Sequence, residues 1–126
     1  MGKEENIIQD KSFEFAVRVV NLYRHLTEEK KEFVLSKQLL RSGTSIGANV
    51  EEAIGGQTRK DFGTKMNTPY KEPRETRYWL RLMKATDYLT EKQAESMLLD
   101  CEENLKILSA ITKTIYKKGT ESETNS

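Results

Sequence analysis

The stretch that decides the fold is Phe62–Lys84, FGTKMNTPYKEPRETRYWLRLMK. Apolar or small residues recur in it at alternating spacings of four and three, a pattern typical of a helix that packs in a bundle. The members of this seam are Phe62, Met66, Pro69, Pro73, Thr76, Leu80 and Met83. We therefore expect one long helix here, beginning near Thr58 and ending near Thr86.

Both prolines of the chain, Pro69 and Pro73, lie on this seam. A proline in a helix interior lacks an N–H and crowds the carbonyl four residues back, which costs ~3 kcal/mol. The helix is then either continuous but bent, or split, with Asn67 or Thr68 capping a second segment. Because the seam keeps its phase across both prolines, we favour a kink, and a break near Pro69 and Pro73 stays open.

Two amphipathic segments precede this stretch. We expect the first helix from residue 12 to residue 26 and the second over residues 28–54. The second contains Gly43 and Gly47, which favour a kink or a brief break, because glycine destabilises a helix interior by about 1 kcal/mol relative to alanine. The predicted core faces are Phe13, Ala16, Val17, Val20, Tyr23 and Leu26 in the first helix, and Leu35, Leu39, Ser42, Ile46, Asn49 and Ala53 in the second.

A fourth helix follows a capping-box pattern formed by Thr90 and Gln93, and we expect it to end at Gly119. Its predicted core face is Ala94, Leu98, Cys101, Leu105, Leu108 and Ile115, widened by Met97 and Ile111. Four amphipathic helices with short links predict an all-α protein, an antiparallel up-down-up-down four-helix bundle. The expected organisation is a flexible N-terminus over residues 1–11, the bundle over 12–118 and a disordered tail over 119–126.

Length and composition point to a single domain in a reducing compartment. A chain of 126 residues fits one domain. Its single cysteine, Cys101, cannot form an internal disulfide, which favours the cytoplasm. The first residues lack the apolar run of a signal peptide, and no window approaches the ~18 apolar residues of a membrane-spanning helix. We expect a cytoplasmic protein with no membrane partner.

Positive charge is concentrated in one segment. Residues 59–84 carry 8 basic and 3 acidic side chains (+5), although the whole chain carries only +1. Within it, a basic ridge of Arg74, Arg77, Arg81 and Lys84 follows spacings of three, four and three. These four side chains fall within an arc of roughly 80° beside the apolar seam, and Tyr70 and Tyr88 are expected on the same side.

Arginine suits bidentate contact with phosphate, so the basic ridge is a candidate site for RNA or DNA. Arg41, Arg59 and Lys60 are candidate extensions of it. Two other interpretations remain open. The ridge is a solvated face with local ion pairs, for example to Glu72 and Glu75, or it is a contact with another subunit or a partner protein.

The sequence holds no pattern typical of catalysis or metal binding. Its one histidine, His25, cannot form a two-histidine metal site, and we expect no catalytic triad around it either. Cys101 on a core face predicts a buried thiol, and Asn49 at a seam position predicts a role in helix register. No phosphate-binding loop or dinucleotide motif occurs. We therefore expect no catalytic residues, no metal and no cofactor, and thus a protein that is not an enzyme.

Three segments carry a family resemblance: LSKQLLRS over residues 35–42, SIGANVEEA over 45–53 and KEPRETRYWL over 71–80. They resemble the bacterial four-helix-bundle proteins named after intervening sequences in 23S ribosomal RNA genes, over about residues 10–117. The resemblance implies an up-down bundle that assembles as a homopentamer, with no catalytic residues. It also implies a distant kinship with the accessory protein of diversity-generating retroelements, a pentameric bundle that binds nucleic acid and a reverse transcriptase. This chain departs from the family pattern at Pro69 and Pro73, where small helix formers are expected.

Together these observations predict a non-enzymatic homo-oligomer that binds RNA or DNA through the basic ridge. The alternative is a structural or adaptor protein whose ridge contacts a subunit or a protein partner.

Overall fold

The computed structural model of the protein describes residues 3–55 and 71–125. All regular secondary structure in these residues is helical: α1 (Lys3–Glu28), α2 (Leu35–Ile54), α4 (Lys71–Ala85) and α5 (Glu91–Asn125). The predicted all-α class is therefore confirmed. The first half of the predicted third helix, with Thr58, Phe62, Met66 and Pro69, lies outside the described residues.

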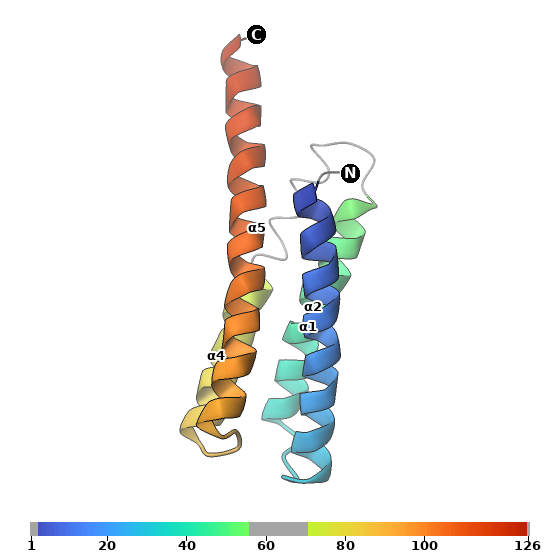
Figure 1. Ribbon diagram of the computed structural model, residues 1–126, viewed down its shortest axis with the longest axis vertical. Helices are drawn as coiled ribbons and strands as arrows, with labels where there is room; N and C mark the ends of the chain where they lie inside the picture. The colour runs from blue at the N-terminus through green and yellow to red at the C-terminus, as the bar shows by residue number, and fades with distance from the viewer. Residues whose placement is uncertain (1–2, 56–70, 126) are drawn as a thin grey trace.

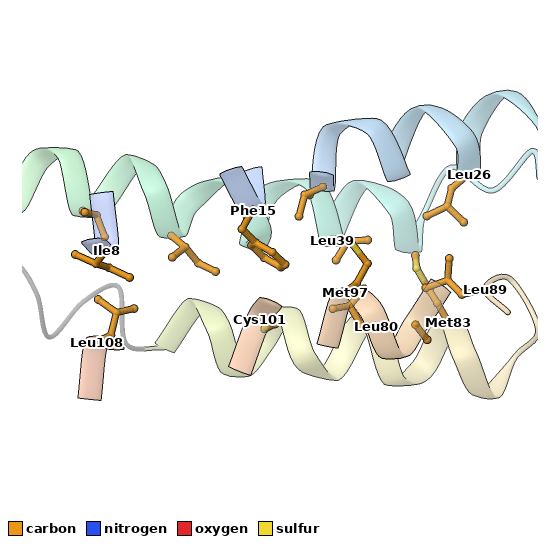
Figure 2. Packing of buried hydrophobic residues seen from close by; sticks show 14 of the residues in the cluster. Ile8, Phe15, Leu26, Leu39, Leu80, Met83, Leu89, Met97, Cys101 and Leu108 are labelled. Atoms are coloured by element: carbon orange, nitrogen blue, oxygen red, sulfur yellow. The ribbon is translucent and has the colours of Figure 1, made fainter. Parts of the chain in front are cut away.

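The four helices surround a common core. α1 packs against α2 and α5, and α4 packs against the same two helices. Figure 1 shows the chain reversing direction between α1 and α2 and again between α4 and α5. Figure 2 shows apolar side chains from all four helices pointing toward one another. Fully buried members include Ile8, Phe15, Val19, Leu26, Leu39, Ile46, Val50, Leu80, Met83 and Leu108. Among the described residues, no helix is both long and apolar enough to cross a bilayer.

The predicted apolar face of α1 is wrong at Phe13 and Val17, although Leu26 is buried as predicted, because the helix carries two apolar stripes. Phe13 and Val17 were assigned to the core, yet they are 67% and 46% exposed. The stripe that faces the core is Ile8, Ser12, Phe15, Val19, Leu22 and Leu26, at strict four-three spacing. It begins inside the segment expected to precede the helix. The predicted start at residue 12 is also wrong, since α1 begins at Lys3.

The start of α2 is set by Glu32, which was not predicted. Its carboxylate accepts backbone N–H bonds from Val34 (3.0 Å), Leu35 (2.8 Å) and Ser36 (2.6 Å). The Ser36 hydroxyl donates to the Glu32 carbonyl at 2.8 Å. Lys31 turns the chain just before, with a φ of 54°. α2 therefore begins at Leu35 and not at residue 28, because these bonds satisfy its first free N–H groups.

The Glu32 side chain is only 8% exposed. Burial by itself raises the pKa of this carboxyl group, but the three backbone N–H bonds outweigh burial. The pKa of Glu32 is therefore lower than usual.

The two glycines of α2 do not interrupt the helix, so the expected break is wrong. Gly43 faces α1 instead. A Cβ atom on Gly43 would lie 2.7 Å from Cγ2 and 2.9 Å from Cγ1 of Val19. The backbone at Gly47 likewise comes close to the carbonyl oxygen of Ser12, 3.3 Å from an added Cβ. The absence of side chains at these positions lets α1 and α2 approach closely, which offsets the weak helix propensity of glycine.

Pro73 is buried in the first turn of α4, as the third residue of that helix. The N–H groups of a first helical turn have no partner within the helix, so a proline there removes no helical hydrogen bond. The Pro73 carbonyl oxygen lies 3.1 Å from the Cys101 sulfur on α5, which donates to it. Pro73 thus lies in the first turn of the described helix and does not interrupt it.

α5 begins with the predicted capping box. The backbone N–H of Thr90 donates to Gln93 Oε1 at 3.0 Å, and that of Gln93 donates to Thr90 Oγ1 at 3.1 Å. The helix continues to Asn125, so the predicted end at Gly119 is wrong. Glycine usually ends a helix by adopting a positive φ, and no described glycine does so.

Candidate nucleic-acid interface on α4

The basic ridge lies on the solvent side of α4. Pro73, Thr76, Leu80 and Met83 are the buried residues of this helix, which confirms the described part of the predicted seam. Opposite them, residues 71–85 present a solvent arc that spans about 140° at 100° per residue. Its members are Lys71, Arg74, Arg77, Tyr78, Arg81, Lys84 and Ala85. The arc contains five cations and no carboxylate, because Glu72 and Glu75 lie toward α2.

Contacts across the α2–α4 boundary determine which way the arc faces. The Thr76 hydroxyl, fully buried, donates to Ser42 Oγ at 2.9 Å and lies 2.7 Å from the Glu72 carbonyl oxygen. Nearer the surface, the Trp79 indole N–H donates to Glu75 Oε1 at 3.3 Å within α4, and the Glu75 carboxylate in turn pairs with Arg41 of α2. These bonds hold α4 in one rotation about its axis, with the basic ridge turned away from α2.

On its other flank, the ridge meets carboxylates of α5. Arg77 Nε lies 3.8 Å from Glu102 Oε1, and Lys84 Nζ lies 3.9 Å from Glu95 Oε1. All four side chains are about half exposed, and ion pairs of this kind contribute about 0–1 kcal/mol. Such weak pairs leave these cations available to a stronger anionic ligand.

An open groove runs between α4 and α5 along the ridge. It is lined by Arg77, Arg81, Lys84, Ala85, Leu98 and Glu102, with a volume of about 420 Å³. Arg81 has no carboxylate within 4 Å among the residues that the structure describes. The groove is thus bordered by three cations and one carboxylate, an arrangement that favours an anion.

Arg41 does not join this surface. It forms ion pairs with Glu75 and, at 3.9 Å, with Glu72 Oε2, both on the α2 flank of α4. The pKa of Glu72 is higher than usual, because burial and the nearby charge of Glu75 raise it more than Arg41 lowers it. Arg41 therefore lies across α4 from Arg77 and Lys84. Arg59 and Lys60 lie outside the described residues.

Tyr78 was not predicted from the sequence, although it lies within the arc at mid-length of α4, near the Lys71 edge. Its side chain is 54% exposed, and its ring meets that of Trp79 edge-on, with centroids 5.0 Å apart. Its position four residues after Arg74 and three before Arg81 could have revealed it. The tyrosines named from the sequence are not available there: Tyr88 packs against the core, and Tyr70 lies outside the described residues.

The other residues singled out in the sequence, Cys101 and Asn49, lie in surroundings that give them no chemical role. Burial, with the charge of Glu102, raises the pKa of Cys101 to about 12, so the thiol is a poor nucleophile. Asn49 is only partly buried, whereas Asn104 is 1% exposed and donates through Nδ2 to the Asp100 carbonyl at 2.9 Å. Across the described ranges 3–55 and 71–125, no group of three or more His, Cys, Asp or Glu side chains is placed to hold a metal ion.

Comparison with known proteins finds a family and similar solved structures. The family described as 23S rRNA-intervening sequence protein matches residues 4–110. A crystal structure from Bacteroides thetaiotaomicron is similar to this chain, with a TM-score of 0.85 and 55% identity over 87% of this chain and 98% of that one. It is described as a protein with unknown function from the S23 ribosomal protein family. No curated protein matches.

Proposed function

This chain belongs to the family of 23S rRNA-intervening sequence proteins, and on that premise we propose that it is a non-enzymatic oligomer that binds RNA or DNA through the basic ridge of α4. The observation that supports this function is the solvent arc, which presents five cations without an intervening carboxylate. Two of the five, Arg77 and Lys84, have only weak pairs with α5 carboxylates, which leave them available to phosphate. Phosphate groups are the common biological ligands of such a surface.

The basic ridge of one chain is short, and oligomerisation would raise its affinity for nucleic acid by bringing several ridges together. Several copies on one nucleic acid bind with an affinity far above that of each site alone. We propose an antiparallel up-down-up-down bundle that assembles into a homo-oligomer, a pentamer as the family resemblance implies. The second apolar stripe of α1 supports such an assembly, because Phe13 and Val17, one turn apart, remain exposed in the single chain.

The nucleic-acid proposal is tested by fluorescence anisotropy with a labelled RNA or DNA at several salt concentrations. If a chain contacts three phosphates of a single strand, its affinity should fall about 20-fold between 50 and 200 mM salt, by counterion release. Arg77→Glu combined with Arg81→Glu should abolish binding. Lys30→Glu combined with Lys37→Glu changes the charge equally at exposed positions away from the ridge and serves as the control. Equal loss in both double variants would contradict a site on α4.

The assembly is tested by light scattering. Phe13→Gln with Val17→Gln should reduce the molar mass to that of a smaller species. Phe33→Gln with Val34→Gln alters an exposed apolar pair in the α1–α2 connection and should leave the mass unchanged. A monomeric wild-type protein would disprove the oligomer.

A second function is favoured by the ion pairs of the ridge with Glu95 and Glu102. These pairs show that the ridge accommodates carboxylates, so an acidic surface of a subunit or partner protein could occupy it. In that case the protein is an adaptor. Reversing the charge of Arg77 and Arg81 would then change the molar mass or partner binding without changing the affinity for nucleic acid.

A further inference from the structure

An aromatic ring lies within the basic surface. Tyr78 projects from the solvent arc at mid-length of α4, near the Lys71 edge of the arc, with 54% of its side chain exposed. Arg74 lies one turn before it and Arg81 one turn after it on the same side of α4. Its phenol oxygen has no hydrogen-bond partner among the described residues, so nothing there holds the ring in a structural role beyond its edge contact with Trp79.

We propose that the ligand of this surface is a single-stranded nucleic acid and that Tyr78 stacks on one of its bases. This inference rests on the proposed function and specifies its ligand. A cation contacts the phosphates of single and double strands alike, whereas a base can stack on a side chain only where it is unpaired. An exposed ring flanked by arginines therefore favours unpaired bases over paired ones. Cations alone give no such preference.

The dimensions of the surface agree with a short single strand. Arg74 and Lys84 are ten residues apart, which corresponds to about 15 Å along the helix axis. That length accommodates a few nucleotides of one chain, with phosphates on the cations and one base on the ring. The groove beside Arg77, Arg81 and Lys84, with Leu98 and Ala85 in its lining, gives the sugar–phosphate chain an adjacent path.

The exposed ring disfavours an RNA duplex as the main ligand of this surface. The major groove of an A-form duplex is too deep and narrow for side chains to reach base edges. A duplex would contact only the arginines and lysines, and Tyr78 would not stack on any of its bases. Duplex binding is therefore expected to be weaker and independent of Tyr78.

The test measures anisotropy of a labelled 12-nucleotide RNA, alone and annealed to its complement, with the full-length protein at 50 mM salt. Tyr78→Ala should weaken single-strand binding about 5- to 150-fold, the range that corresponds to the loss of one stacking aromatic. Tyr78→Phe keeps the ring and should retain the affinity within about twofold, since the proposal needs no hydroxyl. Phe33→Ala removes another exposed aromatic, 61% exposed in the α1–α2 connection, and should have no effect.

A second readout uses the only tryptophan of the chain, Trp79, whose ring touches Tyr78. Single strands should change its emission in the wild type and in Tyr78→Phe, but much less in Tyr78→Ala. Circular dichroism and light scattering show whether each variant keeps its fold and its mass.

The outcomes separate this inference from the proposed function. If single strands and duplexes bind equally and Tyr78→Ala changes neither, while reversal of Arg77 and Arg81 abolishes both, the stacking inference is overturned and nucleic-acid binding stands. If Tyr78→Ala dissociates the oligomer, Tyr78 is a subunit contact and the inference also fails. If neither probe binds at low salt, the proposed function itself is wrong.

Discussion

Removal of the Glu32 carboxylate should destabilise the protein by an amount that depends on pH. The carboxylate accepts three backbone N–H bonds at the start of α2, with only 8% of the residue exposed. Hydrogen bonds to a charged group contribute about 1.5–3 kcal/mol each. The freed N–H groups at a helix end can partly bind water, and losing a capping side chain costs about 0.5–2 kcal/mol.

Because three bonds are lost together at a buried site, we expect the upper part of that range. Glu32→Ala should lower the free energy of unfolding by about 2 kcal/mol at pH 7. Glu32→Gln keeps the shape and one acceptor oxygen but loses the charge, so it should cost about 1 kcal/mol. Glu29→Gln removes an exposed carboxylate three residues earlier and is the matched control, with an expected change below about 0.5 kcal/mol.

The pH dependence follows from the lowered pKa of Glu32. A carboxyl group whose pKa is lower in the folded than in the unfolded state stabilises the fold above its unfolded pKa, about 4.3 for glutamate. This contribution is lost as pH falls through the lower, folded-state pKa. The difference between wild type and Glu32→Gln should therefore be constant near neutral pH and shrink below about pH 4.3.

The assay is urea unfolding followed by circular dichroism at 222 nm, at pH 7, 5.5, 4.5 and 3.5. It is run at constant protein concentration, because oligomerisation also contributes to the measured stability. The reasoning is refuted if Glu32→Ala costs less than about 0.5 kcal/mol, or if the cost of Glu32→Gln is the same at every pH.

Three further predictions concern the core. Gly43→Ala should destabilise by about 1–2 kcal/mol, because the added Cβ meets Val19 at 2.7 Å, although alanine is the better helix former; in a double-mutant cycle with Val19→Ala, additive costs would exclude that clash. Asn104→Leu should raise the free energy of unfolding by about 1 kcal/mol, because Asn104 Oδ1 is buried without a hydrogen-bond partner among the described residues; a lower urea midpoint would contradict this. Cys101, buried and with a pKa of about 12, should react with a thiol reagent at pH 8 only in denaturant, and rapid native labelling would be inconsistent with its position.

The third helix shows why part of the fold was predictable. Thr76, Leu80 and Met83 repeat at four-three spacing, and only one side of α4 could bury them. The same rule failed on α1, where two stripes compete. Ile8, which belongs to the buried stripe, was assigned to a flexible end, and local spacing cannot tell which stripe a partner helix covers.

The candidate site was predictable in its residues but not in its surroundings. The helical spacing of Arg77 and Arg81 places them on one side whatever packs behind them. Glu95 and Glu102, which pair with the ridge, come from α5 and depend on tertiary packing. Arg41 was grouped with the ridge because of its charge, and only the α2–α4 contact shows that it faces the other way. Glu32 was not recognised as the residue that caps α2, because in the sequence it resembles any polar residue of a linker. A helix cap depends on backbone geometry, which the sequence does not show.

The buried hydroxyl pair of Thr76 and Ser42 has a consequence for how the chain assembles. α1 with α2, and α4 with α5, are each neighbours in sequence, so each pair can form from local contacts at a small cost in loop entropy. α2 and α4 join the two pairs, and their contact contains the 2.9 Å bond between these hydroxyls. A slip of one helical turn would break this bond and leave each hydroxyl only its contact with its own helix, to the Glu72 or the Leu39 carbonyl, at a cost of about 0.5–1.5 kcal/mol. A feature that adds little to net stability thus selects the correct alignment of two preformed halves over its nearest competitor.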